Sequence, residues 1–217
     1  MIKRIIKKSF IVLTPFIIFL FNSCLGLSMD IQMNRDGSGR LTMTYRISSS
    51  LSGIGSMDGN ELMPIIPVYR ADWDRTIEKL PGVKLVSYSN RVNARESSVN
   101  VVLDFPNIQS LAALLDSSGE TVTYSQNNLN MILINDNSQR YDNNLIALMR
   151  SFYDDYEFSI NFSSQSNSLL TITDGGGNII NKPARAAVTS SGRRLSFSIG
   201  IMDLLEIPGG LGLSINW

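Results

Sequence analysis

Short segments in which apolar and polar residues alternate with a period of two recur along this 217-residue chain, and this alternation is the strongest constraint on its fold. In residues 27–34, Leu27, Met29, Ile31 and Met33 fall on one side of an extended backbone, with polar side chains on the other. Such a pattern is typical of a strand with one buried face. Related patterns predict strands at residues 41–48, 83–90, 99–105, 122–126, 129–134, 158–162, 169–172, 195–199 and 211–217.

Helical spacing interrupts the strands at three places. Trp73, Ile77 and Leu80 recur at i, i+4 and i+7, which predicts a short amphipathic helix. The same reasoning predicts helices over residues 72–80, 108–115 and 145–156. Each of these helices precedes two predicted strands, so the chain reads as three helix–hairpin units that are alike in order but not in residues.

The order of these segments favours an α+β fold. Turn residues such as those at 36–39 favour hairpins, in which neighbouring strands pair antiparallel. We therefore expect one mainly antiparallel, curved sheet built of β-hairpins, with about three amphipathic helices packed on its apolar face. Closure of this sheet toward a barrel-like shape is an open alternative.

A long irregular connection is expected at residues 49–71, where prolines oppose regular pairing. Connections of this length are uncommon and often functional. This one carries Leu62, Met63, Ile65 and Ile66, which we take as candidate ligand-binding residues that line a groove or lie on lipid. The alternative is a loop folded onto the core.

The first 23 residues have the pattern of an export signal. Four basic residues within the first eight positions precede an uncharged run at 10–21. At about 1.5 Å per residue this run reaches only about 18 Å, which is shorter than the hydrocarbon layer of about 30 Å. We expect residues 1–23 to be a signal peptide and residues 24–217 to form a single mature α+β domain.

The segment Leu20-Phe21-Asn22-Ser23-Cys24 resembles a bacterial lipobox, in the relaxed form found in spirochaetes. This resemblance implies cleavage before Cys24 and attachment of diacylglycerol and an acyl chain to that residue. Two or three acyl chains hold a protein on a bilayer, whereas one chain binds only reversibly. The alternative is an uncleaved signal anchor with a buried cysteine. Apart from the covalent lipid on Cys24, we expect no cofactor.

Charge and composition exclude several classes of function. The chain has 19 Lys+Arg, 19 Asp+Glu and no histidine, and loss of the four basic signal residues leaves a mature charge of −4. An acidic domain is repelled by phosphate backbones, so we expect no nucleic-acid partner. Histidine is the side chain most used for acid–base chemistry near neutral pH, and its absence makes us expect a non-catalytic protein.

Two polar segments have features of chemical sites. Asp154, Asp155 and Glu157 resemble the paired carboxylates of glycosidases, and they support an alternative function as a hydrolase of envelope polymers. The stretch from Asn34 to Gly39 imitates the first half of a calcium loop, but its twelfth position is Tyr45 instead of a bidentate glutamate. We interpret it as a hairpin turn and expect no metal site.

The densest basic stretch of the mature chain contains Lys182, Arg185, Arg193 and Arg194. A solvated loop is the simplest interpretation of these residues. The alternative is a ligand-binding patch for headgroup phosphates or an anionic glycolipid, which a lipid anchor would bring within reach.

A further resemblance covers the mature chain. Its motifs are residues 27–34 with 36–39, Phe105-Pro106, and the closing segments 192–199 and 211–217, which are similar to the domain of LppM-like mycobacterial lipoproteins. The resemblance implies an envelope lipoprotein that binds lipid or glycolipid, with no catalytic residues. We thus expect a lipid-anchored protein of the bacterial envelope, periplasmic or surface-exposed, that binds a lipid, a glycolipid or a partner protein.

Overall fold

The computed structural model describes residues 25–48, 67–94, 96–116, 119–134, 150 and 155–217. In this part of the chain the fold is mixed α+β. The helices are α3 (Arg70–Glu78), α4 (Ile108–Leu115) and α6 (Ile201–Leu205). The strands are β1 (Leu25–Met33), β2 (Gly39–Ser48), β3 (Lys84–Val92), β4 (Glu96–Phe105), β5 (Val122–Ser125), β6 (Asn128–Ile134), β7 (Glu157–Ser163), β8 (Leu169–Thr173), β9 (Ala187–Ser191), β10 (Arg194–Gly200) and β11 (Leu211–Asn216).

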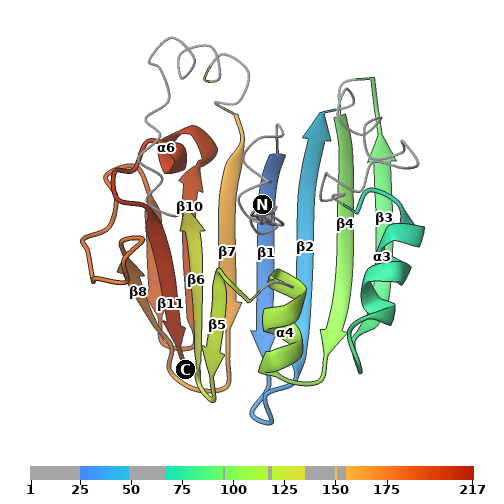
Figure 1. Cartoon of the computed structure of the whole chain (residues 1–217), viewed down its shortest axis with the longest axis horizontal. Helices are drawn as coiled ribbons and strands as arrows, with labels where there is room; N and C mark the ends of the chain where they lie inside the picture. The colour runs from blue at the N-terminus through green and yellow to red at the C-terminus, as the bar shows by residue number, and fades with distance from the viewer. Residues whose placement is uncertain (1–24, 49–66, 95, 117–118, 135–149, 151–154) are drawn as a thin grey trace, which may run out of the picture.

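The strands form two open sheets (Figure 1). The larger has seven strands in the order β3-β4-β2-β1-β7-β10-β9, and the smaller has four in the order β5-β6-β11-β8. All neighbours pair antiparallel except β1 and β7, which are parallel. The first strand of the described chain is therefore the middle strand of the large sheet.

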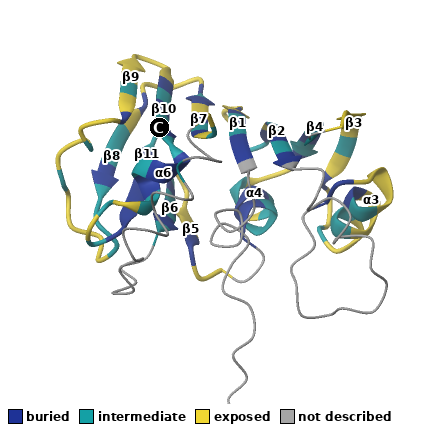
Figure 2. Cartoon of the chain, turned by 90° about the horizontal axis from the view of Figure 1, so that it is seen from above, coloured by how far each residue is buried: buried dark blue, intermediate teal, exposed yellow. Residues whose placement is uncertain are grey.

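The second layer covers one face of the large sheet. Seen from above, the small sheet lies under β7, β10 and β9, whereas α4 and α3 lie under the strands from β1 to β3 (Figure 2). The opposite face of the large sheet carries short polar side chains such as Ser28, Thr44 and Ser159, which align across β2, β1 and β7. This arrangement follows from the alternation, because every second side chain along a strand points to the same face.

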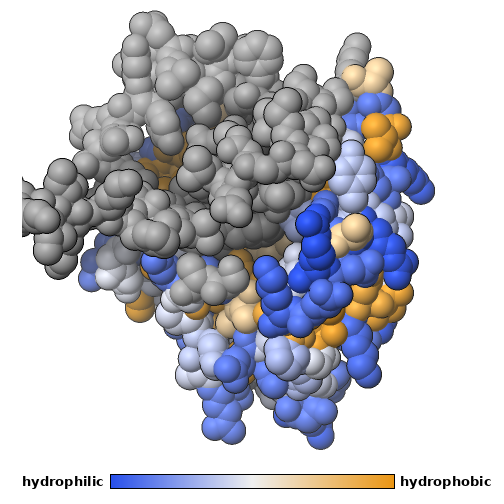
Figure 3. Space-filling view, turned by 45° about the vertical axis from the view of Figure 1, so that its right-hand side comes forward, coloured by the Kyte–Doolittle hydropathy of each residue, from blue (hydrophilic) through white to orange (hydrophobic). Residues whose placement is uncertain are grey.

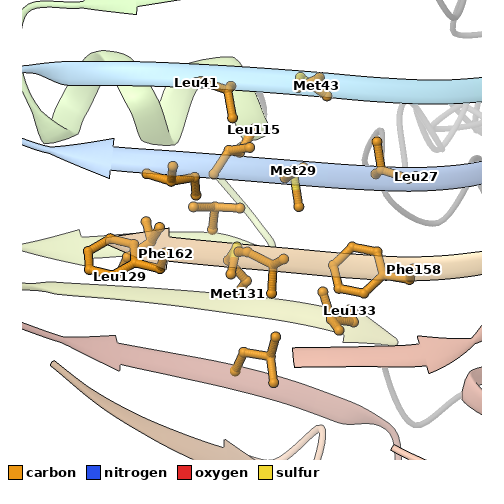
Figure 4. Packing of buried hydrophobic residues seen from close by; sticks show 14 of the residues in the cluster. Leu27, Met29, Leu41, Met43, Leu115, Leu129, Met131, Leu133, Phe158 and Phe162 are labelled. Atoms are coloured by element: carbon orange, nitrogen blue, oxygen red, sulfur yellow. The ribbon is translucent and has the colours of Figure 1, made fainter. Parts of the chain in front are cut away.

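The core fills the space between the two layers. Figure 4 shows side chains of β1, β2 and β7 facing those of β6 and α4, with labels on Leu27, Met29, Leu41, Met43, Leu115, Leu129, Met131, Leu133, Phe158 and Phe162. The rings of Phe162 and Trp217 join the two sheets at a centroid separation of 5.1 Å. Burial of this cluster removes a large apolar area from water, which is the main driving force for the fold.

Most of the predicted elements are confirmed. The α+β class, the hairpins β1–β2, β3–β4 and β5–β6, and the helices at 72–80 and 108–115 are present, and α3 begins at Arg70 within the predicted 49–71 connection. The predicted helix at 145–156 falls almost entirely outside the described residues, as do residues 49–66 of the connection and the signal peptide.

Two expectations about the sheet are wrong for the described strands, and neither described sheet closes into the barrel that was left open as an alternative. The strands divide between two sheets instead of one. The third unit is not a hairpin, because β7 pairs with β1 and β10 in the large sheet while β8 pairs with β11 in the small one. The elements β9 and α6 were not predicted, since β9 is mostly polar and α6 has only five residues.

Candidate functional site: a cleft between two helices

The start of α3 is fixed to the large sheet by a buried polar contact. Trp73 is 3% exposed, and its indole Nε1 donates a hydrogen bond to the Tyr45 hydroxyl at 3.2 Å. The Tyr45 hydroxyl donates to the carbonyl oxygen of Pro67. Burial raises the pKa of Tyr45 well above its ordinary value, because the phenolate would lose its hydration. Tyr45 therefore stays neutral and keeps its proton available for this hydrogen bond.

The first turn of α3 is organised by Asp72. Its carboxylate accepts a hydrogen bond from the backbone nitrogen of Tyr69 at 3.1 Å, which satisfies a free donor at the helix start. Arg75 Nη2 lies 2.5 Å from Asp72 Oδ1, and the Thr76 hydroxyl donates to the Asp72 carbonyl at 2.9 Å. These contacts hold the polar side chains of α3 in defined positions beside Trp73.

Polar side chains fix both ends of the second helix, α4. Asn107 caps α4, since its side-chain oxygen accepts from the backbone nitrogen of Ser110 at 2.9 Å. At the other end, the buried carboxylate of Asp116 accepts from the backbone nitrogen of Thr121 at 2.6 Å and from its hydroxyl at 2.9 Å. The last turn of α4 is thereby held against the sheet.

A cleft of about 360 Å³ lies between α3 and α4. Its lining residues are Pro67, Asp72, Trp73, Arg75, Thr76, Lys79, Leu80, Ala113, Leu114 and Leu115. The apolar members come from both helices and the residues that flank them, and the charged members come from α3 and its C-cap residue Lys79. Figure 3, in which the α3 side of the molecule is turned forward, shows apolar surface interspersed with hydrophilic side chains on this face.

The cleft has the composition of a binding site for an amphipathic molecule. Ligand sites are mostly apolar concavities with a few polar groups that fix orientation. Leu80 and Leu114 can bury an alkyl segment, and Arg75 and Lys79, both exposed, can meet a negative group. The oxygens of Asp72 and Thr76 take part in the helix contacts described above.

The structure separates the four basic residues predicted as a patch. Arg185 lies 2.5 Å from Asp203 of α6, and Lys182 donates to the carbonyl of Ala186 at 2.8 Å. Arg193 and Arg194 lie at the opposite end of β10, which is about 20 Å away at about 3.3 Å per residue.

The charged groups near Lys182 and Arg185 differ from those near Arg193 and Arg194. The carboxylates of Asp203 and Glu206 accept from Arg150 at 3.3 and 2.7 Å, so Arg185 belongs to a mixed cluster of both signs. Arg194 lines a second depression, of about 550 Å³, on the polar face of the large sheet together with Asp30 and Asn161. The basic stretch therefore contributes to two different places.

Some of the remaining predicted site residues are described by the structure, and the others lie outside the described residues. Asp155 and Glu157 are exposed to solvent just before and at the start of β7, away from the α3–α4 cleft. The others lie outside the described residues: Cys24, Leu62, Met63, Ile65, Ile66 and Asp154. The stretch from Asn34 to Gly39 is the β1–β2 turn, as predicted, with the Asp36 carboxylate accepting from the backbone nitrogen and hydroxyl of Ser38.

Comparisons with known proteins identify no relative. No protein-family model matches the chain, and no curated protein is similar enough in sequence to count as a match. Within the described residues, none of the helices has the length and apolar content needed to cross a membrane. The same residues contain no group of three or more acidic, histidine or cysteine side chains that could hold a metal ion.

Sequence reasoning identified parts of the cleft without recognising it as a site. Trp73, Leu80 and Leu114 belong to the apolar stripes that predicted the two helices. Arg75 and Lys79 were not singled out, because isolated cations on a helix have no distinctive pattern. The missing information was that α3 and α4 stand next to each other, which is a property of the sheet order.

Proposed function

We propose that this chain is a bacterial envelope lipoprotein, anchored through a lipid on Cys24, that binds a lipid or glycolipid without catalysing a reaction. The observation that carries the binding role is the cleft between α3 and α4, with its apolar lining and its cations on one side. The anchor rests on the basic and apolar pattern of residues 1–23 and on the lipobox-like segment.

The energetics of such a site suit an alkyl chain with a negative group. Each CH₂ moved from water into an apolar environment contributes about 0.8 kcal/mol. Arg75 and Lys79 supply charge-assisted hydrogen bonds to a phosphate or carboxylate, although Asp72 offsets part of the positive charge of Arg75. We therefore expect the apolar part of the ligand to give most of the affinity.

The resemblance to LppM-like lipoproteins supports the same class of function. It implies an envelope protein of the periplasm or the cell surface that binds lipid or glycolipid. A partner protein is the other occupant that an apolar cleft of this kind would accept. The mature charge of −4 argues against nucleic acid in either case.

Hydrolysis is a weaker alternative. Glycosidase carboxylates face each other across the bound sugar. Asp155 and Glu157 are exposed and do not line the α3–α4 cleft, and Asp154 lies outside the described residues. We therefore retain the non-catalytic proposal.

Native mass spectrometry of residues 25–217, secreted with an ordinary cleavable signal, tests the binding role. We expect one lipid or glycolipid per chain. Leu114→Asp places a charge in the cleft and should remove the ligand, whereas Leu169→Asp on β8, where Leu169 is 62% exposed, should not. A folded chain without a bound lipid contradicts the proposal, and a stoichiometric protein in place of the lipid favours the partner alternative.

A further inference from the structure

The acylated residue would be joined to the folded domain without a flexible tether. The strand β1 begins at Leu25, which is opposite Ile47 of β2, and a single peptide unit joins Leu25 to Cys24. Consecutive Cα atoms are about 3.8 Å apart. Lipid attached to Cys24 would thus begin within one residue of the sheet.

The link between Cys24 and the folded domain cannot be lengthened by detachment of β1 from the sheet. This strand is the fourth of seven and pairs with β2 on one side and β7 on the other. Its inward side chains Leu27, Met29 and Ile31 are 4%, 2% and 0% exposed. Detachment would break two hydrogen-bond ladders and expose these apolar side chains to water. The attachment point is therefore fixed at the middle of one end of the large sheet.

Tyr156 and Arg46 beside this point suit a membrane interface, whereas the exposed carboxylates of Asp155 and Glu157 lie at the same end of the sheet. A Cβ placed on Gly26 would lie 3.3 Å from Tyr156 and 3.5 Å from Arg46 Nη2, so both side chains pass close to Gly26. The Arg46 guanidinium lies 5.0 Å from the centre of the Tyr156 ring and donates to the carbonyl of Asp155 at 3.2 Å. Tyrosine is enriched at membrane–water interfaces, and arginine binds phosphates with charge-assisted hydrogen bonds.

From this geometry we infer that the end of the large sheet where β1 starts rests on the lipid headgroups, so that the strands stand upright on the bilayer. The inference rests on the proposed acylation of Cys24. Three strands lie on each side of β1, so the anchored strand is about 14 Å from either edge of the sheet. The β1–β2 turn is about 30 Å from the anchor along the strand.

Two labelled positions in the full acylated chain test this orientation. The chain contains one cysteine, Cys24, and acylation blocks its thiol, so an introduced cysteine can be labelled selectively. Val92 is 68% exposed and lies in the same row as Leu25, through Ser97 and Ile47. Arg35 is exposed in the β1–β2 turn at the other end.

The measurement uses vesicles of phosphatidylcholine and phosphatidylglycerol that carry a nitroxide quencher on a fraction of their headgroups. A fluorophore on Val92→Cys should be quenched at least threefold more strongly than one on Arg35→Cys. Equal quenching in a chain that floats with the vesicles overturns the upright orientation alone. A chain that does not float overturns the proposed anchoring and the orientation together.

A lengthened junction provides the matched control. Twelve Gly and Ser residues inserted between Cys24 and Leu25 add a reach of about 20 Å and leave the residues of β1 unchanged. Flotation should be retained, and the ratio of quenching at the two positions should fall toward one. An unchanged ratio overturns the inference, because the orientation would then not depend on the short junction.

Discussion

The indole of Trp73 and the hydroxyl of Tyr45 form a buried hydrogen bond of 3.2 Å that joins α3 to the middle of β2. The Tyr45 hydroxyl also donates to the carbonyl of Pro67, just before α3. Water has little access to these three groups, so the Trp73 indole and the Pro67 carbonyl both depend on the Tyr45 hydroxyl for a hydrogen-bond partner. This pair fixes one wall of the α3–α4 cleft, since Pro67 and Trp73 both line it.

Replacement of Tyr45 by phenylalanine should destabilise the protein. Tyr45→Phe leaves the Trp73 nitrogen and the Pro67 carbonyl without their buried partner, which costs about 1–3 kcal/mol of unfolding free energy. Urea unfolding followed by tryptophan fluorescence measures this loss. Tyr124→Phe is the matched control, because Tyr124 is 44% exposed and its change should stay within about 0.5 kcal/mol. Equal effects of the two substitutions would contradict the role of the pair.

Acid should weaken the fold in part through Asp104. Arg40 Nε donates to Asp104 Oδ1 at 2.7 Å, and this hydrogen bond holds the pKa of Asp104 below its ordinary value of 3.8. The unfolded chain therefore takes up this proton first as the pH falls, and unfolding free energy is lost below about pH 4.

The contribution of Asp104 should be small, because both side chains are nearly half exposed and solvent screens them. Urea unfolding between pH 2.5 and pH 6 should show a shallower pH dependence for Asp104→Asn than for the unchanged chain. An identical slope in the two proteins would show that the ion pair does not contribute.

A methyl group at Gly39 should disturb the first hairpin. A Cβ at this position would collide with the carbonyl oxygen of Gln32 and the ring of Phe105, and the backbone oxygen cannot move aside cheaply. Gly39→Ala should therefore cost about 1–3 kcal/mol, as other overpacked sites do. Thermal and urea unfolding measure the cost.

The control for this prediction is Gly176→Ala. The nearest atom to a Cβ there is a side-chain oxygen of Asp174 at 3.3 Å, and no backbone atom lies as close as at Gly39, so the expected change is within about 0.5 kcal/mol. An equal loss of unfolding free energy in Gly39→Ala and Gly176→Ala would contradict the close approach of β2 to β1 and β4 at Gly39.

Local patterns were sufficient to predict most elements but not their partners. The alternation of Met29, Ile31 and Met33 predicts a strand whatever its neighbours are, because burial of one face is a local property. The choice of β7 as the second partner of β1 joins residues that are far apart in the chain. No turn or periodic pattern encodes that choice, so the division into two sheets could not be predicted.

Local patterns likewise predict the residues of the α3–α4 cleft but not the cleft itself. Trp73 and Leu114 are visible in the sequence as members of apolar stripes, which predict that each helix packs on a sheet. The cleft also depends on the spacing between α3 and α4, which the strand order sets. Nearness in sequence does not bring the four basic residues together, since β10 separates Arg185 from Arg194, which divides the patch considered as an alternative to a solvated loop.

The intact mass of the protein isolated from bacterial membranes tests the proposed anchoring most directly. We predict a chain that begins at Cys24 and carries diacylglycerol and one further acyl chain. The Cys24→Ser variant should lose this added mass and leave the membrane fraction. A chain with a different first residue, or a Cys24→Ser variant with unchanged mass and fractionation, would contradict the proposal.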